Sequence, residues 1–204
     1  MRDVLSDAGR QRLDSDDDAR FYDQPRFVHH VDEGFRDRLA RLYADRLGPG
    51  DDVLDLMGSW ISHLPDVEFG RVVGHGLNAE ELATNERYDE WFVQDLNVDS
   101  ELDFSDESFD AVTCAVSVQY LQYPGRVFAE VARVLRPGGV CVVSFSNRMF
   151  PGKAVRAWRD REMDDRADLV SRYLDSTSVF DPPETIREVP GRDPFCAVVA
   201  QRRE

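Results

Sequence analysis

The stretch VLDLMGSWISHLP, from Val53 to Pro65, has the residues of a cofactor-binding turn. Its apolar run contains the carboxylate of Asp55 and leads into small and polar residues, as happens where a buried strand meets a ligand-binding loop. Phosphate-bearing cofactors need glycines here, because the backbone must approach the phosphate closely. Gly58 is the only glycine in the stretch, and no G-x-G-x-x-G pattern follows, which argues against a nicotinamide dehydrogenase.

Metal and disulfide chemistry have little support in the sequence. The three cysteines, Cys114, Cys141 and Cys196, show no C-x-x-C spacing, and the four histidines show no H-x-x-x-H or H-x-H spacing. Cys114 and Cys141 lie inside apolar runs, so we expect both to be small core residues. We therefore predict no metal site and a reducing compartment.

Apolar runs of strand length alternate with segments of helical spacing along most of the chain. Strands are expected within residues 52–57, 67–76, 90–97, 109–121, 140–147 and 194–203, with a weaker one near 186–189. Helices are expected at 28–47, at 78–86 with Asn78 as N-cap, at 125–135 before an Arg-Pro-Gly-Gly turn, and at 153–174. This alternation predicts an α/β fold with a doubly wound, mostly parallel sheet, whose ligands bind beyond the carboxyl ends of the strands.

Several segments resemble class I S-adenosylmethionine-dependent methyltransferases, most closely the small-molecule branch called type 11. The segments are VLDLMGSWISHLP, VVGHGLNAEEL, FVQDLN, LDFSDESFDAVTCAVSVQYL and VFAEVARVLRPGGVCVVSFSNRMF, within residues 50–150. The S-W-x-S-H-L-P phrase further resembles an uncharacterised subgroup with a divergent glycine motif. The resemblance implies a seven-stranded sheet, an N-terminal helical lid, S-adenosylmethionine as cofactor and methyl transfer to a small molecule.

The resemblance also implies a set of cofactor-binding positions. They are Asp55, Met57, Gly58, Ser59, Gly76, Asn78, Asp95, Leu96, Asn97, Ser117 and Val118. Asp95 would accept a hydrogen bond from the adenine amino group. Two departures stand out: family glycines align with Met57, Ser59 and Ile61, and the acid expected to bind the ribose aligns with Gly76. Asn78, Glu80 or Glu81 would have to take over the ribose contact.

Methyl transfer is an in-line displacement that needs close approach and, for some acceptors, a base. In the family the acceptor site is covered by residues before the first strand, and FYDQPRFVHHVDEG fits this lid. His29 and His30 would lie on different faces of the expected helix, so at most one faces the site. The predicted catalytic residues are His30, Tyr22, which would close the pocket, and Tyr120, on the acceptor side.

Composition limits the classes of partner that the protein is expected to bind. The 204-residue chain has a net charge of −15, which disfavours nucleic acid and anionic membranes, and its apolar runs are shorter than the ~20 residues of a membrane span. The N-terminus resembles no signal peptide, so we expect a cytoplasmic protein. The single lysine, Lys153, and the aspartate excess resemble the proteome of a salt-loving organism. The oligomeric state stays open.

We expect residues 1–48 to form an acidic tail, frayed over its first twenty residues, and a helical lid, and residues 49–204 to form the methyltransferase-like domain. Two functions remain open: methyl transfer to a small-molecule acceptor, or a methyltransferase-like fold that has lost or exchanged its cofactor and serves as a binding or regulatory module.

Overall fold

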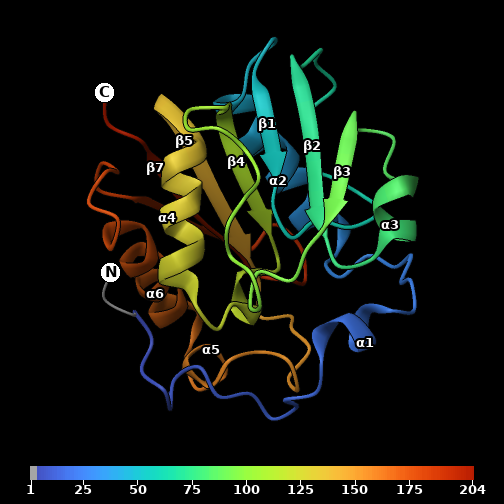
Figure 1. The fold of residues 1–204 in the computed structure, drawn as a ribbon, viewed down its shortest axis with the longest axis vertical. Coiled ribbons are helices and arrows are strands. Elements are labelled where there is room, and N and C mark those ends of the chain that lie inside the picture. Colours follow the sequence, from blue (N-terminus) through green and yellow to red (C-terminus); the bar gives the residue numbers. More distant parts are fainter. Residues whose placement is uncertain (1–3) are drawn as a thin grey trace.

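A seven-stranded sheet forms the centre of the computed structural model, which describes residues 4–204 (Figure 1). The strands are β1 (Asp52–Asp55), β2 (Arg71–Gly76), β3 (Glu90–Val93), β4 (Phe109–Ala115), β5 (Leu135–Phe145), β6 (Glu184–Glu188) and β7 (Phe195–Gln201). Their order is β3-β2-β1-β4-β5-β7-β6, and β7 alone runs antiparallel to its neighbours. The predicted doubly wound, mostly parallel fold is confirmed.

Helices cover both faces of this sheet. They are α1 (Asp18–Tyr22), α2 (Glu33–Arg46), α3 (Ala79–Thr84), α4 (Pro124–Val134), α5 (Arg156–Arg159) and α6 (Met163–Asp175). One face packs against α4 and α6, and the opposite face packs against α2, as the two views show. Phe35, Leu39 and Leu42 of α2 are fully buried against the sheet, so this helix is part of the core.

Two helix predictions were wrong in extent. The helix expected at 28–47 begins only at Glu33, because the Asp32 side chain accepts a hydrogen bond from the Phe35 amide and caps it there. His29 and His30 therefore lie in a loop and not on a helix.

The helix expected at 153–174 is two helices, α5 and α6. The carbonyl of Trp158, at the end of α5, accepts a 3.1 Å hydrogen bond from Arg166 Nε of α6. The same carbonyl also accepts from the Arg161 amide at 3.2 Å, and the added bond from Arg166 ties the start of α6 to the end of α5. Trp158 itself is fully buried against Phe145.

The N-terminal segment runs across the carboxyl ends of the parallel strands, which point downward in Figure 1. Backbone bonds join it to the segment after β5: Asp14 donates to Gly152, and the Gly9 carbonyl accepts from Ala157. The expectation of a frayed terminus was wrong for residues 4–20, and residues 1–3 lie outside the described part. No helix within residues 4–204 is long and apolar enough to cross a membrane.

Candidate active site

A cavity of about 280 Å³ lies between the strand ends and the N-terminal segment. It sits where β1 and β4 are neighbours and the chain winds off in opposite directions, the usual ligand position in such folds. Every predicted site residue lines it except Val118, which is buried in the core. Those that line it are Tyr22, His30, Asp55, Met57, Gly58, Ser59, Gly76, Asn78, Asp95, Leu96, Asn97, Ser117 and Tyr120.

The turn after β1 keeps a glycine-type backbone without the glycine. Met57 has φ of +59°, in the left-handed region that glycine adopts freely and other residues adopt at a cost. Residues 56–70 then contain neither helix nor strand. Met57 thus has a backbone conformation that glycine favours, and β1 is joined to β2 by a loop and not by a helix.

His75 holds this turn in place. Its Nδ1 accepts a 2.9 Å bond from the Met57 amide, and its carbonyl accepts a 2.7 Å bond from the Gly58 amide. Because Nδ1 accepts, the proton must be on Nε2, which lies 2.9 Å from the Gln94 carbonyl. Burial lowers the pKa of His75 to about 4, so the ring is neutral. No sequence pattern predicts this role of His75, because its partners Met57 and Gln94 are brought to it only by folding.

Tyr88 is a further residue that the sequence analysis missed. Its hydroxyl donates to Asp55 at 2.7 Å, and Thr113 donates to the other oxygen of Asp55 at 2.9 Å. A Cβ at Gly58 would lie 2.3 Å from the Tyr88 hydroxyl, and one at Gly74 would lie 2.2 Å from its ring, so both glycines make room for Tyr88. Burial raises the pKa of Asp55 in spite of the two bonds. Asp55, held by Tyr88 and Thr113, therefore orders the turn after β1 from its buried side.

Gly76 has no room for the acid that the family places there. A Cβ at Gly76 would lie 2.7 Å from the Gly58 carbonyl oxygen. The carboxylate on this side belongs instead to Glu81 of α3, which accepts from the Arg26 amide at 2.7 Å and from the Ser59 hydroxyl. Glu81 thereby ties the N-terminal segment to the turn after β1.

Asn78 caps α3, as predicted, by accepting from the Glu81 amide at 2.9 Å. Its amide group donates to the carbonyls of Tyr22 at 2.8 Å and Asp23 at 3.2 Å. All of its polar atoms have protein partners, so Asn78 anchors α1 over the cavity.

Asn97 and Lys153 close the side of the cavity below β3 and β4. Asn97 donates to the Tyr120 carbonyl at 3.1 Å and to Asp18 at 3.2 Å. Lys153 is 1% exposed, and its Nζ lies 3.2 Å from carboxylate oxygens of both Asp18 and Asp14. The only lysine of the chain thus pairs with the start of α1.

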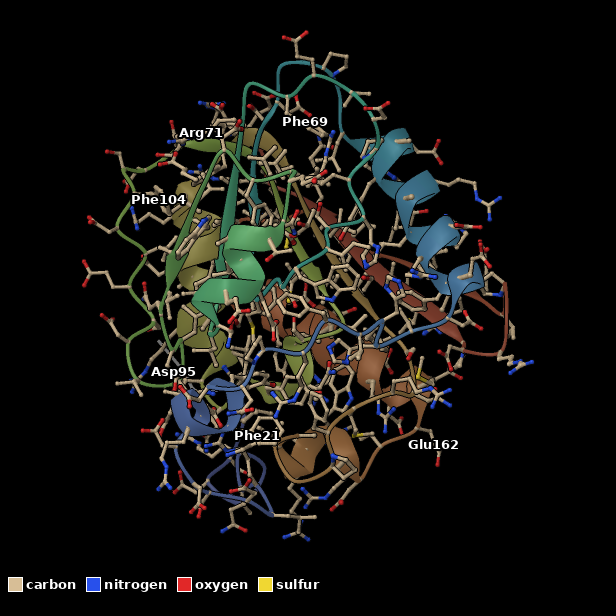
Figure 2. The ribbon with its side chains drawn as sticks, turned by 90° about the vertical axis from the view of Figure 1, so that its right-hand side faces the viewer. Phe21, Phe69, Arg71, Asp95, Phe104 and Glu162 are labelled. Atoms are coloured by element: carbon tan, nitrogen blue, oxygen red, sulfur yellow. The ribbon has the colours of Figure 1, made fainter. Side chains whose placement is uncertain are left out.

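Asp95 lies beside α1 at this end of the molecule, where Figure 2 labels it. One of its carboxylate oxygens accepts from the Asn97 amide at 2.8 Å, and partial burial raises its pKa. The other oxygen has no hydrogen-bond partner within residues 4–204. Leu96 beside it is 3% exposed.

The three predicted catalytic residues surround the ring of Phe150. Ring centroids of His30, Tyr22 and Tyr120 lie 5.6, 6.5 and 6.1 Å from it. Burial raises the pKa of both tyrosines, and Tyr120 Oη accepts a 2.9 Å bond from the Phe150 amide. Desolvation lowers the pKa of His30, so among the three only His30 is ready to accept a proton at neutral pH.

Comparisons with known proteins show which proteins this part of the chain resembles. Residues 57–143 match the family model described as "Methyltransferase domain". Residues 57–143 are therefore similar to a methyltransferase domain. It is 34% identical over 142 residues to demethylmenaquinone methyltransferase of Renibacterium salmoninarum, covering 66% of this chain and 58% of that protein. It is 32% identical over 103 residues to a ubiquinone/menaquinone biosynthesis C-methyltransferase of Brucella canis, covering 48% of this chain and 37% of that protein.

Solved structures agree on the fold. An S-adenosylmethionine-dependent methyltransferase of Mesorhizobium loti superposes with a TM-score of 0.55 at 18% identity, covering 81% of this chain and 96% of that one. Phosphoethanolamine N-methyltransferase 2 of Haemonchus contortus, bound to S-adenosylmethionine, superposes with a TM-score of 0.59 at 14% identity, covering 82% of this chain and 53% of that one.

Proposed function

We propose that the chain transfers a methyl group from S-adenosylmethionine to a small-molecule acceptor bound in the cavity. The observation that carries the proposal is that residues 57–143, which match the methyltransferase domain, supply the part of the cavity at the carboxyl ends of β1 to β4. The cofactor supplies an activated methyl group, so the protein needs to position the acceptor, exclude water and, for some acceptors, remove a proton.

The residues present fit S-adenosylmethionine in spite of the missing glycines. The cofactor has no phosphate, so it does not depend on a cradle of free backbone amides, and the Met57 and Gly58 amides are already bonded to His75. Asp95 has a carboxylate oxygen without a protein partner for the adenine amino group, and Leu96 offers an apolar contact. The turn from Met57 to Ser59 would hold the methionine part.

Apart from Tyr120, the acceptor side is built by residues outside the matched segment. His30, Tyr22 and Phe150 precede or follow residues 57–143, so acceptor choice is a property of these added segments. The chain spans 58% and 37% of the two curated relatives named for quinone methylation. A small molecule is the acceptor that suits an enclosed cavity of about 280 Å³ in a chain of net charge −15.

Calorimetric titration with S-adenosylmethionine and S-adenosylhomocysteine, in molar KCl, tests the proposal. We expect one molecule of either ligand to bind per chain, with micromolar affinity, and to raise the thermal midpoint. No heat and no thermal stabilisation at millimolar ligand would overturn it and would favour the second hypothesis, a methyltransferase fold that binds a partner without cofactor.

A further inference from the structure

One side of the cavity contains hydrogen-bond donors that the protein leaves unpaired. The Nε atom of Arg36 and the hydroxyl of Ser62 are buried and have no hydrogen-bond partner within residues 4–204, and both residues line the cavity. Buried polar groups are nearly always paired, so unpaired donors that face a cavity point to a ligand that supplies the acceptor.

Arg36 is the more informative of the two. Its guanidinium forms no ion pair within residues 4–204, although the chain has 40 acidic residues. Arg38, two residues later on α2, makes a two-pronged pair with Glu188 at 2.7 and 2.9 Å. Arg36 lies on the face of α2 that meets the cavity, where the protein provides no counter-ion.

His63 adds a further polar side chain beside Arg36. His63, next to Ser62, also lines the cavity, and its pKa is lowered to about 4, mainly by burial and then by Arg36 and His29. His63 is therefore neutral at neutral pH and close enough to Arg36 to sense its charge. The corner thus offers one positive charge, a hydroxyl and a neutral imidazole.

We propose that Arg36 and Ser62 bind a carboxylate group of the molecule held in the cavity. A guanidinium and a hydroxyl match the acceptor oxygens of a carboxylate, and one positive charge balances one negative charge. A phosphate, with up to two negative charges, would keep one charge that the guanidinium of Arg36 does not balance, and it would be repelled by the acidic chain. The proposal deepens the proposed function and rests on it for the identity of the ligand.

Two molecules could supply this carboxylate: the amino-acid part of the cofactor, or an acidic acceptor. Ser59, at the turn expected to face the methionine part, already donates to Glu81 and is not available to a carboxylate. Ser62 and Arg36 are available to bind the carboxylate of either molecule. Probes that carry or lack the carboxylate separate the two.

The experiment compares R36Q with R41Q, using calorimetry and thermal midpoints. Arg41 lies on the same helix but is exposed and does not line the cavity, so R41Q is a matched loss of charge. The probes are S-adenosylhomocysteine and 5′-methylthioadenosine, which lacks the amino-acid part, and benzoate with its neutral analogue benzamide. R36K, which keeps the charge, serves if R36Q unfolds.

A cofactor carboxylate predicts that R36Q weakens S-adenosylhomocysteine binding by about 10-fold to 100-fold, the range for a charge-assisted hydrogen bond, and leaves methylthioadenosine unchanged. An acceptor carboxylate predicts unchanged nucleoside binding, with stabilisation by benzoate but not benzamide in the wild type, lost in R36Q. Equal behaviour of R36Q and R41Q towards S-adenosylhomocysteine and benzoate overturns the proposal.

A wild type that binds neither nucleoside would overturn the proposed function alone. The benzoate titration, run without nucleoside, then still decides the Arg36 proposal: binding that R36Q abolishes supports a carboxylate site, and no binding overturns it.

Discussion

The two ends of the cavity differ in how many of their polar side-chain atoms have hydrogen-bond partners in the protein. At the end below β2, β3 and β4, Asn78, Glu81 and Asn97 are bonded to the N-terminal segment or to neighbouring loops. At the end facing α2, Arg36 and Ser62 keep donors without protein partners. Hydrogen-bonded polar groups make a structure more rigid. A buried donor without a partner destabilises the protein until a ligand accepts its hydrogen bond. The first end holds the N-terminal segment in place and leaves an Asp95 oxygen for a ligand, and the second end leaves donors of Arg36 and Ser62 for a ligand.

The largest effect is expected from breaking the paired end at Lys153. K153M would leave Asp18, which is 5% exposed, with Arg12 as its remaining cationic partner. The loss of unfolding free energy should therefore lie at the lower end of the about 3–5 kcal/mol that breaking a buried pair costs. Urea denaturation measures the loss. R156M removes half of the exposed pair Arg156–Asp160 and should cost less than about 1 kcal/mol. Equal losses of unfolding free energy in K153M and R156M would contradict the view that the buried ion pair of Lys153 stabilises this end of the cavity.

His75 predicts a pH dependence of stability. Its folded-state pKa is lowered from 6.5 to about 4, so between these values the unfolded chain binds a proton that the folded chain does not. Stability should be complete above the unfolded value and fall by about 3 kcal/mol as the pH drops towards 4. Urea denaturation of H75Q should show a smaller fall than the wild type, with part retained through His63. H29Q, at an exposed position, should follow the wild type.

D95A tests whether the end of the cavity near β3 also binds the ligand. The loss of the adenine partner should weaken S-adenosylhomocysteine and methylthioadenosine equally, by about 1–3 kcal/mol, the cost of an unsatisfied buried group. Calorimetry with both ligands gives the result. D99A, at an exposed aspartate outside the cavity, is the control. Unchanged affinity for both ligands would remove Asp95 from the adenine site.

The smallest effect is expected at Trp60, which supports the loop before α2. Its Nε1 donates to the Val28 carbonyl at 3.3 Å, and its ring lies 5.1 Å from that of His29. W60F keeps most of the apolar contact and loses this long bond, so it should cost about 0.5–1.5 kcal/mol or less. Thermal unfolding measures the change. A loss of stability as large as that of K153M would show that the N-terminal segment is held equally strongly at both ends of the cavity.

Much of the fold was predictable because it depends on local pattern. The apolar runs predicted all seven strands, and the cap at Asn78 followed from residue type. The turn expected at Arg136–Gly139 was wrong, because these residues lie inside β5, where Gly138 has φ of +80°. Helix ends were less predictable. The start of α2 at Glu33 and the break before Met163 depend on side-chain bonds from Asp32 and Arg166 that periodicity does not contain.

The site divides in the same way. Strand order and the switch between β1 and β4 follow from the alternation of elements, so the sequence by itself determined where the cavity lies and which strand ends line it. Only the tertiary structure decided which polar atoms remain available. His75, Tyr88 and Arg36 act through partners that are distant in sequence or absent, and the burial and pairing that define their roles exist only once the chain has folded.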